Sequence, residues 1–190
     1  MGKIVVTELA LKGVKIIEPT VYGDNRGHSF ESCSVKDLRE AGIDFDCVLE
    51  YQAYNKDVNT LRGIHFQNNP HAQNKIVRVV NGAIRDFVID LRKDSPDYKK
   101  WISCELSADN FKQIYIPAGF GHAFITLQAD TRVLYKFDDY YNGPLAKTIR
   151  WDDPELNIDW GHSDFIMSSG DANAVTLSES DVNYSMEINK

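Results

Sequence analysis

Apolar and polar residues alternate in short stretches along most of the chain, and Gly, Pro, Asn, Asp or Ser residues separate one stretch from the next. A period of two is typical of half-buried β-strands, because successive side chains point to opposite faces. Two early segments, residues 13–17 and 28–33, show this pattern. The centre is denser, and we expect strands over residues 75–80, 83–90, 101–106, 113–116, 122–127 and 131–137. Asn81-Gly82, between the first two central strands, predicts a hairpin turn.

One short helix and an irregular tail depart from the alternation. Residues 35–41 favour a helix, with Ser34 as its N-terminal cap and Gly42 just beyond its end. From about residue 152 the pattern is less regular. We expect a loosely attached tail there, with a short helix around residues 154–156.

Many short strands and few helices favour an all-β fold, either a sandwich or a barrel. Residues 117–122 read PAGFGH and fit the P-x-G-x-x-H pattern of cupin-type jelly rolls, also called double-stranded β-helices. In this pattern Pro and Gly make a turn, and His122 enters the next strand facing the interior. We expect a single domain over residues 1–190, with its core at about 14–160 and a tail at 161–190.

The bulk composition excludes several classes of protein. A hydrophobic content of 43% over 190 residues suits a folded domain with a sizeable core. A net charge of -7 argues against nucleic-acid binding, which requires a basic surface to neutralise phosphates. No apolar run reaches the length of a membrane span, and the N-terminal residues lack the apolar core of a signal peptide. We therefore expect a cytoplasmic protein without membrane association.

Three side chains in the predicted strands suggest proton abstraction next to a carbonyl. The imidazole of His65 is a candidate base, the ammonium of Lys75 a candidate for stabilising the resulting oxyanion, and the phenol of Tyr135 a candidate acid. Asp171 is a candidate carboxylate to orient the base. Each also has a structural interpretation: a strand histidine, a lysine at an exposed strand end, a half-buried tyrosine and a turn aspartate.

A metal site is the main chemical alternative. Metal-binding cupins use His-x-His with a nearby Glu, whereas residues 65–67 read HFQ and no Glu follows before Gly82. The three cysteines are too widely spaced to form a zinc ligand set. We therefore predict neither a metal nor another cofactor. In the absence of a glycine-rich phosphate loop, a phosphate would be bound by side chains, and inward-facing arginines would suit this role.

The chain resembles the dTDP-4-dehydrorhamnose 3,5-epimerases, which are small cupin-fold enzymes of nucleotide-sugar metabolism. The similarity runs from about residue 14 to 160, with a weaker extension to residue 177. The segments that carry it are GDNRG (residues 23–27), FES (30–32), LRGIHFQ (61–67), AQNKIVR (72–78), DLRKDSP (90–96), LSA (106–108), IPAGF (116–120), LYK (134–136), YY (140–141) and IRWDDP (149–154).

The resemblance implies a role for ten residues and a dimer. The catalytic base falls on His65, its orienting carboxylate on Asp171, the enolate-stabilising lysine on Lys75 and the acid on Tyr135. Substrate-binding positions fall on Arg26, Glu31, Gln52, Arg62, His122 and Tyr141. In the family two chains exchange N-terminal strands, which would bring Arg26 and Glu31 to the neighbouring site of a homodimer.

The resemblance also implies a reaction: inversion of C3 and C5 in a dTDP-4-keto-6-deoxyhexose, giving dTDP-4-dehydro-L-rhamnose. The chain departs from the family pattern at His28 and Ser29, where aromatic residues are usual, and at Tyr54, Gly161 and Gly170. Three alternatives remain open. They are a C3-only epimerase, an epimerase of another 4-keto nucleotide sugar, and a cupin that binds a nucleotide sugar without catalysis.

Overall fold

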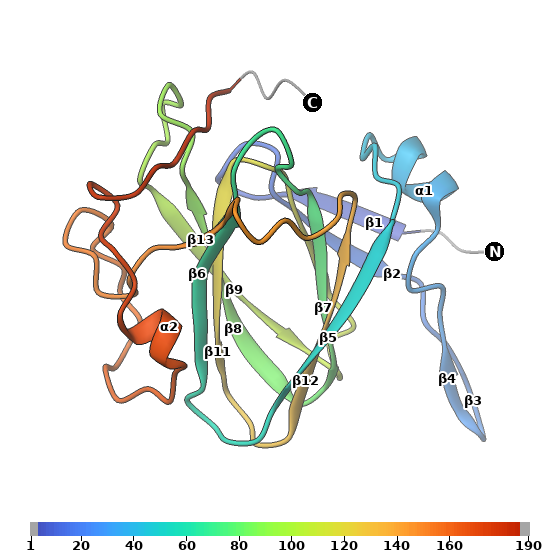
Figure 1. Cartoon of the computed structure of the whole chain (residues 1–190). Coiled ribbons are helices and arrows are strands. Elements are labelled where there is room, and N and C mark those ends of the chain that lie inside the picture. The colour runs from blue at the N-terminus through green and yellow to red at the C-terminus, as the bar shows by residue number, and fades with distance from the viewer. Residues whose placement is uncertain (1–3, 187–190) are drawn as a thin grey trace.

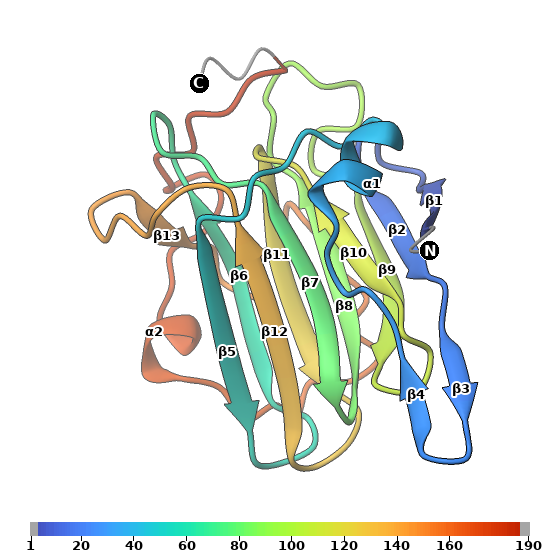
Figure 2. The ribbon, with the colours of Figure 1, turned by 90° about the vertical axis from the view of Figure 1, so that its right-hand side faces the viewer.

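Across residues 4–186, which this computed structural model describes, the chain forms two antiparallel sheets that face each other (Figures 1 and 2). In spatial order, the six-stranded sheet contains β1 (Ile4–Glu8), β2 (Lys15–Pro19), β10 (Gln113–Ile116), β7 (Lys75–Asn81), β12 (Thr131–Phe137) and β5 (Leu49–Asn55). The five-stranded sheet contains β13 (Ala146–Thr148), β6 (Leu61–Gln67), β11 (Phe120–Thr126), β8 (Ala83–Asp90) and β9 (Trp101–Ser107). The predicted all-β jelly roll is confirmed.

The predicted strands agree with the observed ones in the centre of the chain, where β8, β10 and β12 have the expected bounds. The strand predicted for residues 28–33 is wrong beyond Ser29. Residues Tyr22–Asp24 (β3) and Gly27–Ser29 (β4) form a separate hairpin, which projects from the body of the molecule (Figure 1). Phe30 leaves this hairpin and packs against Phe111, with 5.4 Å between ring centroids.

The hairpin predicted at Asn81-Gly82 is also wrong. Strands β7 and β8 lie in different sheets, so this turn carries the chain from one sheet to the other. The turn is tight: Gly82 has a φ of +81°, and a Cβ there would lie 2.3 Å from Oγ1 of Thr131. A turn between facing sheets and a turn within one sheet therefore share the same sequence signal.

Three groups of buried apolar side chains hold the layers together. The first fills the space between the sheets and includes Val77, Val88 and Phe124. The second lies between the outer face of the six-stranded sheet and helix α1 (Val35–Glu40) with the loop that follows it. Ser34 caps this helix as predicted, accepting a hydrogen bond from the Asp37 amide at 3.3 Å. The third group lies under the C-terminal tail.

The tail is packed against the five-stranded sheet rather than loosely attached. Leu177, Val182 and Tyr184 are no more than 5% exposed and join the third apolar cluster. The tail covers the sheet because the outward-facing residues of β8, such as Phe87 and Ile89, are as apolar as the inward-facing ones. The helix predicted near residues 154–156 is a turn, and α2 (Ser169–Ala172) is the helix of this region.

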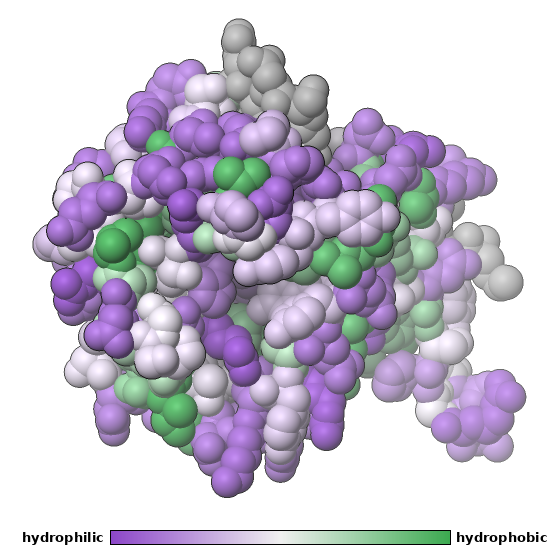
Figure 3. Space-filling view, in the orientation of Figure 1, coloured by the Kyte–Doolittle hydropathy of each residue, from purple (hydrophilic) through white to green (hydrophobic). Residues whose placement is uncertain are grey.

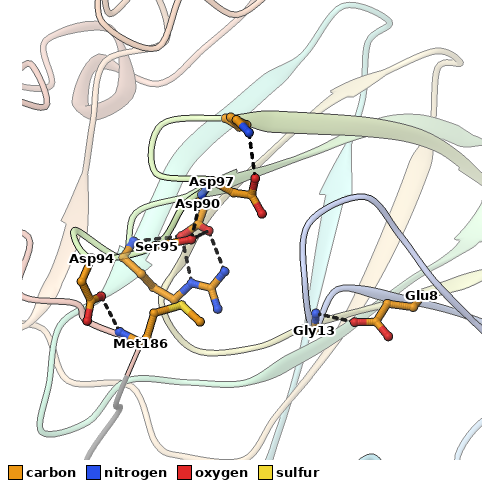
Figure 4. Close-up of polar contacts among 9 residues, drawn as sticks. Glu8, Gly13, Asp90, Asp94, Ser95, Asp97 and Met186 are labelled. Carbon is orange, nitrogen blue, oxygen red and sulfur yellow. Dashed lines mark hydrogen bonds and ion pairs between the residues drawn. The ribbon is translucent and has the colours of Figure 1, made fainter.

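A buried polar network fixes the segment after β8. Asp90 accepts hydrogen bonds from Arg92 and from Ser95, whose hydroxyl lies 2.7 Å from Oδ2 (Figure 4). The Arg92 guanidinium also lies 4.3 Å from the Phe120 ring centroid. This network ties the loop after β8 to the start of β11, the strand that carries His122. Within residues 4–186, no helix has the length and apolar character needed to cross a membrane.

Candidate active site

A bulge in β6 turns two candidate residues into the space between the sheets. Arg62 pairs with Phe124 and His65 pairs with His122, so two residues of β6, at positions 63 and 64, lie opposite one residue of β11. Simple alternation would place Arg62 and His65 on opposite faces, whereas the bulge puts both on the interior face. Gly63 makes this possible, since its φ is +132° and a Cβ there would lie 2.4 Å from the Ala123 side chain.

His65 forms a close pair with the tail residue Asp171. Nε2 of the imidazole lies 2.7 Å from Oδ1 of the carboxylate. Burial disfavours the charged form of Asp171. However, hydrogen bonds from His65, the Gly63 amide and Ser168 outweigh this effect and lower the pKa of Asp171 below its usual value. An ionised Asp171 accepts a hydrogen bond from Nε2–H of His65, which leaves Nδ1 as the imidazole nitrogen that can accept a proton.

A second imidazole–carboxylate pair lies deeper, and its carboxylate was missed by the sequence analysis. Nε2 of His122 lies 2.7 Å from Oδ2 of Asp86, a residue of β8 with no exposed surface. Burial lowers the pKa of His122 despite the neighbouring carboxylate, so its imidazole is neutral near pH 7. A signal was present in the sequence, because Asp86 occupies an inward position between Ile84 and Val88 in the alternating pattern of β8.

The six-stranded sheet supplies Lys75 and Tyr135, both less than 10% exposed. Burial lowers the pKa of Lys75 from 10.5 to about 8, and the negative charge of Asp86 partly offsets this effect. Burial also raises the pKa of Tyr135 well above 10, so its phenol keeps its proton. The Tyr135 ring lies 5.9 Å from that of His122, and thus contacts the buried pair across the gap between the sheets.

A cavity of about 370 Å³ opens beside these groups and is large enough for a small ligand. His65, Lys75, Tyr141 and Thr148 contribute to its lining. A second, more apolar cavity of about 530 Å³ shares Tyr141 and contains Tyr51. The face shown in Figure 3 is mostly hydrophilic, with hydrophobic residues in small separate groups.

The other candidate residues are distributed unevenly around this cavity. Arg62 lies in the interior, where its Nε donates to Oδ1 of Asn55 at 2.7 Å. Gln52 is exposed on the outer face of the six-stranded sheet, because its cross-strand partner is Leu134 and the neighbouring Tyr51 takes the inward position opposite Tyr135. The structure therefore does not bring Gln52 to the cavity of its own chain.

Arg26 and Glu31 also lie away from this cavity. Arg26 is at the turn of the projecting β3–β4 hairpin, where its guanidinium pairs with Asp24 at 2.6 Å. Glu31 follows the hairpin and is exposed. Within residues 4–186, no group of three or more His, Cys, Asp or Glu side chains is arranged to hold a metal ion.

Comparison with known proteins agrees with this architecture. Residues 8–179 match the family model for dTDP-4-dehydrorhamnose 3,5-epimerase. A protein of that name from Sinorhizobium fredii is 38% identical over 177 residues, covering 93% of this chain and 91% of its own.

Two solved structures are also similar. The dTDP-4-dehydrorhamnose 3,5-epimerase of Bacillus anthracis, with TDP and PPi bound, has a TM-score of 0.89 at 40% identity, covering 91% of this chain and 99% of its own. The dTDP-6-deoxy-D-glucose-3,5-epimerase of Legionella pneumophila, in complex with dTDP-4-keto-L-rhamnose, has a TM-score of 0.89 at 35% identity, covering 94% and 95%. The chain therefore belongs to the dTDP-4-dehydrorhamnose 3,5-epimerase family of cupin-type isomerases.

Proposed function

We propose that this protein inverts C3 and C5 of a dTDP-4-keto-6-deoxyhexose, converting dTDP-4-dehydro-6-deoxy-D-glucose into dTDP-4-dehydro-L-rhamnose. One observation carries the proposal: a carboxylate-paired imidazole and a nearly buried lysine, on facing sheets, line the same cavity. The ketone at C4 acidifies the hydrogens on both neighbouring carbons. A base and an oxyanion-stabilising group are therefore the two elements that the reaction requires.

In the first step, His65 removes the proton from the carbon next to the ketone. The Nδ1 atom accepts it, because Asp171 holds the proton on Nε2 and stabilises the imidazolium that forms. The electron pair of the broken C–H bond moves toward C4, and its oxygen becomes an enolate oxyanion. This site needs no redox step, since the carbon that loses a proton to His65 regains the electron pair together with a proton from another group.

Lys75 stabilises the enolate. Its amine lines the cavity at 8% exposure, and within the described part of the chain it has no hydrogen-bond or ion-pair partner. Its Nζ lies 5.8 Å from the Phe137 ring centroid, and a buried ammonium with no anion beside it is costly, so an oxyanion that pairs with it is bound strongly. Negative charge on the substrate also raises the pKa of Lys75, which keeps the ammonium protonated through the reaction.

Tyr135 returns a proton to the opposite face of the carbon. It lies on β12, in the sheet that faces β6 and His65, so the base and the acid approach the sugar from different sides. After the first inversion His65 releases its proton to solvent and Tyr135 regains one from solvent. Repetition of the two steps at the second carbon then gives the doubly inverted sugar. His122, which burial keeps neutral and which hydrogen-bonds to Asp86 through Nε2, retains Nδ1 as an acceptor for a substrate hydroxyl.

The test is incubation with dTDP-4-keto-6-deoxyglucose in D₂O, followed by proton NMR at C3 and C5. Deuterium at both carbons together with the L-rhamno product supports the proposal. Deuterium at C3 alone identifies a C3-only epimerase. Absence of exchange in a folded protein that binds the nucleotide sugar identifies a binding-only cupin. Absence of both binding and exchange directs the search to another 4-keto nucleotide sugar.

We also propose a homodimer with exchanged N-terminal strands, in which Arg26 and Glu31 complete the neighbouring site. All residues of β3 and β4 are exposed and the hairpin projects from the body of its own chain, which it contacts through His28 and Phe111; these features support this arrangement (Figure 1). Sedimentation equilibrium should give twice the chain mass, and Arg26→Ala should weaken dTDP binding; a monomer of full activity would contradict the dimer. The expectation of a cytoplasmic location stays a prediction.

A further inference from the structure

Gln67, the last residue of β6, forms side-chain hydrogen bonds to the backbone on both sides of Tyr141. Its side-chain Nε2 donates to the carbonyl oxygen of Tyr140 at 3.0 Å. Its Oε1 accepts from the backbone amide of Asn142 at 2.8 Å. The side-chain amide thus pairs with this loop as a neighbouring strand would. The Nε2 group also donates to the His71 carbonyl oxygen at 2.5 Å, so the side-chain amide joins the two residues that flank Tyr141 to the segment that follows β6.

Tyr141 needs such support because little else fixes it. Its side chain is 71% exposed, yet it lines both cavities and stands where they meet. A tyrosine on an unsupported loop would lose this position to conformational entropy. Gln67 is 4% exposed and anchored in the sheet, where its backbone pairs with Ala146. It therefore connects a rigid element to an exposed ring at the mouth of the site.

Other contacts hold the same loop without enclosing Tyr141. The imidazole Nδ1 of His71 lies 3.1 Å from Oδ2 of Asp139, and the other oxygen of Asp139 accepts from the Tyr140 amide at 2.7 Å. Removal of the His71 side chain leaves this second Asp139 contact in place. Gln67 and His71 therefore both hold this loop. The Gln67 side chain also donates to the backbone carbonyl oxygen of His71 at 2.5 Å, a contact that His71→Ala keeps, but only Gln67 of the two bonds to the backbone on both sides of Tyr141.

We propose that Gln67 is a positioning residue that places Tyr141 at the mouth of the site and thereby sets the affinity for the nucleotide part of the substrate. The proposal rests on the proposed function, in which Tyr141 contacts a dTDP-sugar. Gln67 lines the same cavity as His65 and Lys75, but its described side-chain hydrogen bonds go to the backbone of residues 71, 140 and 142 and not to a proton-transfer group. Its loss should therefore affect binding and leave the chemical step at saturating substrate nearly unchanged.

The experiment is a double-mutant cycle with Gln67→Met and Tyr141→Ala, read by calorimetric titration with dTDP and by the exchange rate at saturating sugar nucleotide. Gln67→Met should weaken dTDP binding by about three- to tenfold, the range expected for an unfixed side chain, with little change in kcat. In the Tyr141→Ala background the same substitution should have no further effect on affinity. His71→Ala is the matched control and should bind dTDP as the wild type does.

Equal dTDP affinity of Gln67→Met and the wild type would overturn the inference, as would fully additive losses in the double variant. Should the wild type bind no dTDP, both this inference and the proposed substrate fail. Binding without exchange rejects the proposed reaction alone. If Gln67→Met does not fold, hydrogen exchange in the unmutated protein decides: a protected Asn142 amide supports the inference, and a freely exchanging one overturns it.

Discussion

The site contains two imidazole–carboxylate pairs with the same separation and different access to solvent. His65 and Asp171 lie 2.7 Å apart, with side chains 46% and 9% exposed. His122 and Asp86 also lie 2.7 Å apart, but their side chains are only 4% and 0% exposed. The distance between imidazole and carboxylate therefore does not determine which pair is the base. Exposure to solvent does, because the base must reach the substrate and its proton must later exchange with water.

The two pairs also differ in how the chain builds them. Asp86 and His122 sit on the adjacent strands β8 and β11, where the register puts both inward. Asp171 lies on helix α2 of the tail, which packs beside the five-stranded sheet. Oδ1 of Asp86 has no hydrogen-bond donor among the described residues, and the Asp86 carboxylate raises the pKa of the nearby Lys75. We thus interpret the accessible pair as the base and the buried pair as its electrostatic support.

The largest expected difference between the pairs is in catalysis. His65→Asn should reduce deuterium exchange at C3 by about 10³-fold or more, since a positioned base typically contributes about 10²–10⁴-fold. His122→Asn should cost about tenfold, because it removes a substrate contact rather than the base. Exchange rates at saturating substrate, with circular dichroism to verify folding, make the comparison. Equal losses in the two variants would remove the distinction between the pairs.

The carboxylates should differ in the pH profile as well as in the rate. Asp171→Asn should lower kcat by about 10²-fold, because an amide cannot stabilise the imidazolium. The alkaline limb of the pH profile should not move. Asp86→Asn removes a charge that raises the pKa of Lys75, so that pKa should fall below about 8 and the alkaline limb should move to lower pH. The measurement is kcat/KM from pH 6 to 10. An unmoved limb in Asp86→Asn would contradict the assigned role of this carboxylate.

The smallest expected effect is a gain in the free energy of unfolding when the charge of Lys75, near the buried His122–Asp86 pair, is removed. Folding lowers the pKa of Lys75 from 10.5 to about 8, so the folded state disfavours the ammonium. Below pH 8 both states are protonated, and the cost is present in full. Between pH 8 and 10.5 the unfolded state binds more protons, so the stability of the wild type rises with pH.

Lys75→Met should therefore be more stable than the wild type by about 2 kcal/mol at pH 7, and this gap should narrow as the pH approaches 10.5. The variant should also lose epimerase activity, which provides an internal control that the removed charge is functional. Urea unfolding at pH 7 and pH 10 measures the gap. A destabilised variant, or a stability difference that does not depend on pH, would show that burial of the Lys75 ammonium does not destabilise the folded protein.

The sequence predicts the parts of this site that follow regular alternation. Lys75 and Tyr135 occupy inward positions of well-predicted strands, and the fold class follows from the number of strands. Strand periodicity alone could not predict that Arg62 and His65 lie in the same site. Their separation by three residues requires the bulge at Gly63, which depends on the close approach of Ala123 on another strand.

Long-range packing explains the remaining differences. Asp171 is 106 residues from His65, and no local pattern predicts that the tail folds back over the five-stranded sheet. The choice between Tyr51 and Gln52 as the inward residue depends on the register of β5 against β12. Likewise, Asn81-Gly82 predicts a tight turn correctly, whereas the sheet to which each flanking strand belongs is decided by its distant neighbours.

The most direct test of the account is the behaviour of Tyr135→Phe in D₂O with dTDP-4-keto-6-deoxyglucose. The central claim is that His65 removes a proton on one face of the carbon and Tyr135 returns one on the other. Without the phenol, His65 should still remove the proton and return deuterium to the same face. We therefore expect labelled substrate of unchanged configuration with little epimer. Epimer formed at the wild-type rate, or a complete absence of label in the folded variant, would contradict it.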